Sequence, residues 1–261
     1  CVNSILSLNY LGSISIVIVD NGSSNNSGNQ VREYFAHTPE VYFIANQQNL
    51  GFANGNNTGY TFARNTLKSD IVGIFNNDLL VHQKNLMQRV IDDFNDPKLS
   101  ILGPDITDES RIRHSNPQKP PRSYFLDVFK YVIVALFTIL LPEYLLEFYG
   151  RNKTQSDSQK TFRNLSMKLT SVQLHGSCLF VGNDFLKYEK TLFYPKTFLY
   201  LEEDFLFQFC ARNDYTTMFD PSIHVIHKGG VSTSKIDSNF KHRKLKNIRY
   251  HLSSLRLLVF Y

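Results

Sequence analysis

The chain has 261 residues, of which 42% are hydrophobic and 20% are charged, and its formal net charge is +5. These proportions are ordinary for a folded domain and exclude a disordered, collagen-like or coiled-coil chain. The positive charge indicates an anionic partner and leaves three classes open: nucleic acid, a membrane surface or a phosphorylated small molecule.

The three cysteines, Cys1, Cys178 and Cys210, have no paired spacing. They predict neither a zinc site nor a disulfide framework, and we interpret each as a small buried hydrophobe. This usage is typical of a reducing compartment, so we expect a cytoplasmic protein. The chain opens without a start methionine or a leader, and we expect it to be a piece of a longer protein.

The first hundred residues alternate short apolar runs with stretches of helical spacing. Strands are predicted at 13–20, 41–45 and 71–75, where apolar runs end in polar turns. Helices are predicted at 31–37, within 51–67 and at 83–95. This alternation indicates a βαβ-type α/β sheet.

After Pro104 the composition changes. A proline-rich, basic stretch at 116–122 precedes an apolar run at 124–149, and a polar linker follows at 151–160. A membrane-spanning helix needs about 20 apolar residues, more than the uninterrupted core of this run provides. We therefore interpret the run as either a buried helix or an interfacial helix that touches a membrane.

The last third returns to α/β sequence. Its predicted elements are sheet-like sequence at 172–181, a helix at 198–213, a strand at 222–226 and a partly helical tail. Residues 228–261 hold eight Lys or Arg against one acid, so the basic excess belongs to the tail. This tail is a solvated helix face, a diphosphate-facing loop near Lys228 or a patch for anionic lipid headgroups.

Polar side chains follow two of the predicted strands. Asp20 and Asn21 end the first strand, and Asn77 and Asp78 end the third. Ligands of open α/β sheets bind outside the carboxyl ends of strands. Asp20 could accept a hydrogen bond from a base or ribose, and Asp78 could share a divalent cation with diphosphate oxygens. Each carboxylate could instead close a turn or cap a helix.

Glycines recur at every fourth position in the segment Asn49–Gly59, at Gly51, Gly55 and Gly59. On a helix they share one face, which allows close backbone approach. Such a face packs tightly on a sheet, and a helix start here would aim N–H groups at an anion. The GKS or GKT ending of a Walker loop is absent.

Three adjacent acids, Glu202, Glu203 and Asp204, follow an aromatic run. Beside apolar walls they suit general-base catalysis, and at a helix start they would interact with its dipole. His224 and His227, three apart on a strand, point to opposite faces, so at most one faces a given site. We favour His227.

The ordered motifs resemble the family 2 inverting glycosyltransferases of the GT-A fold, most closely rhamnosyltransferase-like enzymes of bacterial surface-polysaccharide synthesis. The matching segments are IVIVDNGSS (16–24), NLGFANGNNTG (49–59), FNNDLLV (75–81), LHGSCLFV (174–181), FLYLEEDFLFQFCARNDY (198–215) and HVIHKGG (224–230). The resemblance implies an α/β GT-A (Rossmann-like) fold with a mixed, mostly parallel central sheet flanked by helices. It implies one domain with a donor half at 1–104, a helical insertion at 105–170 and an acceptor-binding, catalytic half at 171–261.

The resemblance also assigns roles. The implied donor-binding positions are Asp20, Asn21, Asn49, Gly51, Asn57, Asn77 and Gly176. Asp78 would contact a Mg²⁺ or Mn²⁺ ion bound to the diphosphate, with help from His227. The family's Glu-Asp pair falls on Glu202 and Glu203, which makes Glu203 the expected base; a shift of one residue would make it Asp204.

Three departures from the family pattern stand out. The usual first strand is missing, because the sequence starts inside the helix that follows it. Asn76 replaces the first Asp of the metal motif, which weakens the expected metal affinity, and Glu203 stands where Asp is usual.

The implied function is transfer of a sugar from a nucleotide-diphosphate sugar to a saccharide acceptor, lipid-linked in such pathways, with inversion. We expect peripheral contact with the inner face of the cell membrane. The alternatives are a non-catalytic nucleotide-sugar-binding subunit of a polysaccharide assembly complex and a sugar-phosphate nucleotidyltransferase. A nucleic-acid partner is not expected, because no binding motif accompanies the charge.

Overall fold

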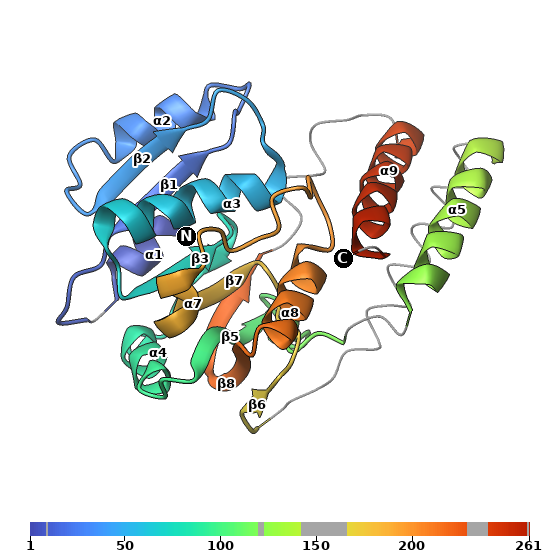
Figure 1. Ribbon diagram of the computed structural model, residues 1–261. Helices are drawn as coiled ribbons and strands as arrows, with labels where there is room; N and C mark the ends of the chain where they lie inside the picture. Colours follow the sequence, from blue (N-terminus) through green and yellow to red (C-terminus); the bar gives the residue numbers. More distant parts are fainter. Residues whose placement is uncertain (9, 120–122, 142–165, 229–239, 260) are drawn as a thin grey trace.

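The computed structural model describes residues 1–8, 10–119, 123–141, 166–228, 240–259 and 261 (Figure 1). The predicted linker at 151–160, the end of the apolar run from 142 and residues 120–122 lie outside this part of the chain. The strands are β1 (Ile16–Asp20), β2 (Val41–Ala45), β3 (Ile71–Phe75), β4 (Leu79–Leu80), β5 (Leu99–Thr107), β6 (Leu169–Thr170), β7 (Cys178–Gly182) and β8 (Thr216–His227). The helices are α1 (Val2–Leu6), α2 (Ser27–Tyr34), α3 (Gly51–Phe62), the π-helical turn η1 (Ala63–Leu67), α4 (Leu86–Phe94), α5 (Tyr124–Leu140), α7 (Asn183–Tyr188), α8 (Glu202–Arg212) and α9 (Phe240–Val259).

The strands form two sheets. Five strands of the larger sheet lie in the order β3-β7-β5-β8-β4, with β6 paired to β8, and β1 and β2 form a separate pair. Among the described strands, β1–β2 and β5–β8 pair in parallel and the other pairs are antiparallel. The expected mixed α/β architecture is confirmed, although parallel pairs do not dominate it, because β7 runs against both of its neighbours.

The core lies on both faces of the larger sheet. Ile101 and Val181, paired across β5 and β7, belong to a cluster shared with α3, α7 and α8. Their successors in the ladder, Leu102 and Phe180, belong to a cluster shared with α1 and α4. Successive strand residues point to opposite faces, so these buried strands are apolar on both sides.

Several predicted elements are confirmed at their exact bounds, and others shift. The strands at 41–45 and 71–75 are confirmed residue for residue, and the range 51–67, within which a helix is predicted, is helical throughout. The sheet-like run from 172 becomes a strand only at Cys178. The predicted helix at 198–213 begins at Glu202, because Tyr200 and Leu201 have φ angles of 74° and 68°, outside helical values.

The sequence does not predict β5, although all nine of its residues are buried. Gly103 and Pro104 interrupt its pattern, and a strand interior disfavours both. The sheet accommodates them with a register shift between Pro104 and Asp105.

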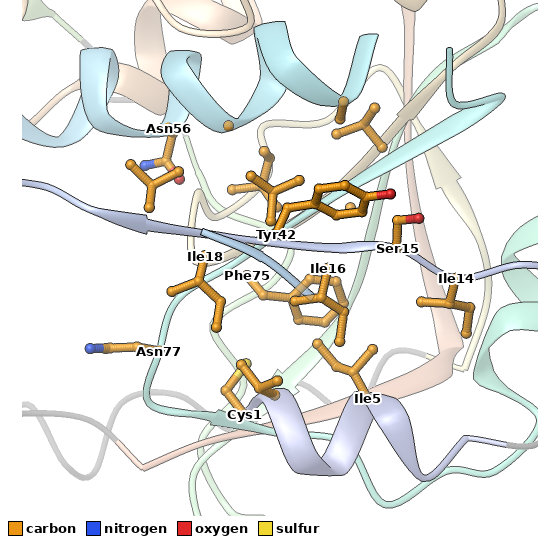
Figure 2. Close-up of a pocket in the computed structure, with 18 of the residues that line it drawn as sticks. Cys1, Ile5, Ile14, Ser15, Ile16, Ile18, Tyr42, Asn56, Phe75 and Asn77 are labelled. Atoms are coloured by element: carbon orange, nitrogen blue, oxygen red, sulfur yellow. The ribbon is translucent and has the colours of Figure 1, made fainter. Parts of the chain in front are cut away.

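A cavity of about 1380 Å³ lies between β1 and β3, whose facing edges are not hydrogen-bonded to each other. In Figure 2, Ile16 and Ile18 of β1, Ile5 of α1 and Phe75 of β3 point into this space. Its wall also includes Asn77, directly after β3. The cavity is thus apolar along the strands and polar where the strands end.

Candidate active site

Asp20 and Asn21 stand at the carboxyl end of β1, where the sequence places them. The Asp20 carboxylate accepts a hydrogen bond from the Ser23 N–H at 3.1 Å. Asn21 connects the two strand-end loops: its amide donates to the Gly51 carbonyl at 2.9 Å and accepts from the Asn46 amide at 3.0 Å. Asn21 therefore fixes the loop before α3. The Asp20 carboxylate lies at the cavity wall and can accept further hydrogen bonds there.

The glycine face of α3 packs against β1, as predicted. A Cβ on Gly55 would lie 2.7 Å from the Asn21 amide nitrogen, and one on Gly59 would lie 3.1 Å from Val19. The expectation that this helix start aims N–H groups at an anion is wrong for its first amides. The Gly51 N–H donates to Asn49 Oδ1, and the next N–H along the chain donates to the Phe198 carbonyl.

Asn57 is buried on α3 and its amide is engaged by another segment. It donates to the Phe193 carbonyl at 2.8 Å and accepts from the N–H groups of Leu192 and Phe193. These hydrogen bonds connect α3 to the segment that contains Leu192 and Phe193. Asn49 and Asn57 are not part of the cavity wall, whereas Asp20, Asn21 and Asn77 are. Of the predicted donor positions, Asp20, Asn21, Gly51 and Asn77 line the cavity, and Asn49 lies next to them because its Oδ1 accepts from the Asn21 amide at 3.3 Å.

Asp78 and His227 meet across a short antiparallel pair. Asp78 lies in the turn between β3 and β4, and His227 ends β8 opposite Leu79. Their side chains contact each other at 3.1 Å between Oδ1 and Nε2, and the Lys228 N–H donates to the Asp78 carbonyl. The prediction that His224 and His227 face opposite ways is confirmed, because His224 instead lies 3.5 Å from Asp105.

His175 is the site residue that sequence reasoning missed. Its ring lies edge-to-face with that of His227, with centroids 6.1 Å apart. Burial lowers the pKa of His175, while the charges of Glu203 and Asp78 act in the opposite direction. The Ser177 N–H donates to His175 Nδ1 at 3.1 Å, which leaves Nε2 to carry the proton of the neutral ring. Its position directly before Gly176, in a matching motif, is the signal that could have found it.

The three acids at the start of α8 occupy different environments. Glu203 is partly exposed, and its Oε1 accepts the Gly176 N–H at 3.0 Å. Asp204 is buried and accepts from the Tyr124 hydroxyl at 3.1 Å. Burial, with the charge of Glu203, raises the pKa of Asp204 to about 6 and that of Glu202 to about 8.

Asp78 and His227 could hold a divalent cation together with diphosphate oxygens. Within the described ranges, no group of three or more His, Cys, Asp or Glu side chains is placed to hold a metal ion. A carboxylate and an imidazole in contact, both partly accessible, are nevertheless a reasonable donor pair for Mn²⁺ or Mg²⁺ when phosphate oxygens supply the other ligands. These residues therefore fit a cation whose ligands come partly from the substrate, not one coordinated by protein side chains alone.

Comparisons with known proteins bear on this site. The family pattern described as glycosyl transferase family 2 matches residues 1–163. No curated protein sequence matches the chain. Among solved structures, the mannosyltransferase PcManGT from Pyrobaculum calidifontis, in complex with GDP-Man and Mn²⁺, matches with a TM-score of 0.53 and 13% identity. The match covers 98% of this chain and 59% of PcManGT, so the chain spans less than two thirds of that protein.

A second solved structure, GalNAc-T7 with UDP, GalNAc and Mn²⁺, matches with a TM-score of 0.48 and 14% identity, over 95% of this chain and 44% of that one. The likeness to PcManGT confirms the expected GT-A architecture. The family pattern covers more than half of the residues. The chain belongs to glycosyl transferase family 2.

Proposed function

We propose that this protein transfers a sugar from a nucleotide-diphosphate sugar to a saccharide acceptor, with inversion at the anomeric carbon. The observation that carries the proposal is the convergence of four side chains from separate segments. Asp78 and His227 are in contact, His175 lies beside His227, and Glu203 accepts the N–H of Gly176, the residue that follows His175. The donor complexes of PcManGT and the family membership support the same reaction class.

Glu203 is the general base of this proposal. Its carboxylate is held by the Gly176 N–H and remains partly exposed, so it can reach an acceptor hydroxyl. The hydroxyl proton passes to Glu203 as the acceptor oxygen forms its bond to the anomeric carbon. The bond from that carbon to the diphosphate oxygen breaks on the opposite face, and the nucleoside diphosphate leaves with the electron pair.

Asp78 and His227 would hold a Mg²⁺ or Mn²⁺ ion at the diphosphate, and that ion would supply Lewis-acid stabilisation of the leaving group. Asp20, Asn21 and Asn77 border the polar end of the cavity and would bind the nucleotide. Gly176, through its N–H, orients the base. Asp204 is a positioning residue, because its carboxylate is buried and engaged by Tyr124.

The proposed acceptor is a lipid-linked saccharide, in cell-surface polysaccharide synthesis of the rhamnosyltransferase type, at the inner face of the cell membrane. The apolar helix α5 begins at Tyr124, which is bonded to the acidic cluster. An apolar element beside the site suits an acceptor with a lipid tail. A cytoplasmic protein in peripheral contact with the membrane would meet both substrates.

The test compares Glu203→Gln and Asp204→Asn with Asp214→Asn, an exposed acid whose positive φ asparagine tolerates. Each is assayed for transfer from a panel of nucleotide sugars with Mn²⁺. Glu203→Gln should lower the transfer rate at least about 10²-fold, which is the low end of the rate enhancement that a general base usually contributes. Normal rates in Glu203→Gln would refute the assignment of the base.

A non-catalytic nucleotide-sugar-binding subunit is the second candidate, favoured by Asn76 at the first metal-motif position. It predicts a thermal shift with a nucleotide sugar and Mn²⁺ but no transfer by the wild type. Turnover by the wild type would exclude it.

A further inference from the structure

Helix α5 has an apolar face that no described residue covers. Nine of the 17 exposed large hydrophobic side chains in the described part of the chain lie on this helix, with exposed fractions from 42% to 78%. They include Phe125, Phe129, Ile133, Leu136 and Leu140. Single exposed hydrophobic residues are common, but a continuous face of this kind marks an interaction surface. Within the described part of the chain, α5 is exposed along this face, so the alternative of a buried helix is wrong there.

The opposite face of α5 packs on α9. The Tyr131 ring stacks on that of His251, with centroids 4.6 Å apart, and Thr138 is fully buried. Near the end of α5, the Lys241 ammonium donates to the Ile139 carbonyl. These contacts make α5 and α9 an antiparallel pair, and Figure 1 shows α5 on the outer side of it. The apolar face of α5 thus points away from the rest of the protein.

Helix α9, which packs on α5, carries positive charge on its own exposed side. It contains six Lys or Arg residues and no acid. Lys246, Arg249 and Arg256 are exposed and recur at spacings of three and seven residues, which places them on one side of the helix. The pair therefore combines an apolar face with a basic one, the pattern of helices that lie in a membrane interface.

We propose that α5 and α9 together form a docking surface for a bilayer containing anionic phospholipids. The apolar face of α5 enters the interface between headgroups and acyl chains, and the basic side of α9 binds the headgroups. Among the described residues, no helix is long and apolar enough to cross a bilayer.

Docking would place the acidic cluster near the lipid surface. The Tyr124 hydroxyl donates to Asp204, and the Tyr200 ring stacks on His251 with centroids 3.7 Å apart. The Ser254 hydroxyl also donates to the Leu199 carbonyl. Both helices are thus bonded to the segment that carries the candidate base. The benefit of this arrangement for a lipid-linked acceptor rests on the proposed function; binding to the bilayer does not.

The experiment measures co-sedimentation of the 261-residue chain with vesicles, in the absence of donor and acceptor. The vesicles contain phosphatidylcholine alone or phosphatidylcholine with phosphatidylglycerol, at low and high salt. The apolar variant is Phe129→Ala, Ile133→Ala and Leu136→Ala, and its control is Ile112→Ala, Met167→Ala and Tyr188→Ala, which are exposed elsewhere. The basic variant is Lys246→Gln, Arg249→Gln and Arg256→Gln, and its control is Lys98→Gln, Lys187→Gln and Lys190→Gln, all exposed.

The wild type and both controls should bind the anionic vesicles, and high salt should weaken the binding. The basic variant should bind about a hundredfold more weakly, since each cation near an anionic surface strengthens binding roughly fivefold. The apolar variant should bind at least about tenfold more weakly. Circular dichroism verifies that each variant is folded, and the two variants test the surface independently.

Equal binding of wild type to neutral and anionic vesicles would overturn the proposal, as would variants that bind like their controls. A wild-type dimer that the apolar variant converts to monomer, without vesicle binding, would assign the α5 face to a second copy of the chain. Because no sugar transfer is measured, failure of this experiment is separate from failure of the proposed enzyme activity.

Discussion

Replacing Glu202 by glutamine should stabilise the protein at alkaline pH and have much less effect at acidic pH. Glu202 is 3% exposed, and its Oε1 has no hydrogen-bond partner among the described residues. Burial, with the charge of Glu203, raises its pKa from 4.5 to about 8. Between these values the folded state keeps a proton that the unfolded state has released, so stability falls as pH rises.

The size of the effect follows from this shift. One pKa unit corresponds to about 1.4 kcal/mol, so raising the pH from 5 to 8 should cost the wild type about 3 kcal/mol through this group alone. Glutamine has no charge to bury, and Glu202→Gln should escape that cost. The difference between variant and wild type cancels the contributions of other titrating groups.

Urea unfolding followed by circular dichroism at pH 5 and pH 8 measures this difference. Glu33→Gln, on the exposed surface of α2, is the control and should show the same small effect at both values. If Glu202→Gln increases the free energy of unfolding equally at pH 5 and pH 8, or more at pH 5, then burial does not hold Glu202 protonated.

Three further predictions concern other parts of the molecule. Gly51→Ala should destabilise the fold by about 2 kcal/mol in urea, since Gly51 has a φ of 82° and a Cβ there would lie 2.3 Å from the Phe198 carbonyl oxygen. Asp78→Asn should abolish the extra thermal shift that Mn²⁺ adds to a nucleoside diphosphate. Lys168→Met should destabilise the fold by roughly 2 kcal/mol, and more at pH 8 than at pH 5, because it leaves the buried Asp93 carboxylate without its ammonium partner.

Each of these has a matched comparison. Gly59→Ala, where a Cβ meets only the side chain of Val19, should cost less than Gly51→Ala. Asp214→Asn should keep the Mn²⁺ effect, and Lys187→Met, at an exposed position, should leave stability unchanged. A reversed order in any pair would contradict the corresponding explanation.

The strands that the sequence predicts well are those whose signal is local. The runs at 41–45 and 71–75 are apolar and bounded by polar residues, so pattern alone fixes their bounds. The start of α8 depends on positive φ angles at Tyr200 and Leu201, which their residue types do not indicate. In β5, Pro104 is followed by a register shift against β8, which the local pattern does not indicate.

The residues of the candidate site also differ in whether a local sequence signal reveals them. Asp20, Asp78 and the acids of α8 are visible in sequence because each follows a recognisable run. His175 is not, since its importance comes from His227 and Glu203, which are distant in the chain. The predicted donor roles and the division at 104 and 170 stay predictions, and the choice between Glu203 and Asp204 is a prediction for the transfer assay above.

In the 261-residue chain, no backbone hydrogen bonds join β1 to β3, and this has a consequence for the motions of that chain. Because no backbone ladder joins the two sheets in the described part of the chain, the β1–β2 pair packs on the rest of it through side chains and through α3. Its amides should exchange with solvent through local opening more readily than those of β5 and β7, which the core clusters enclose. A nucleotide held between Asp20 and Asn77 would join the two sheets, so donor binding should slow exchange in β1 and β2, far beyond the atoms that it touches.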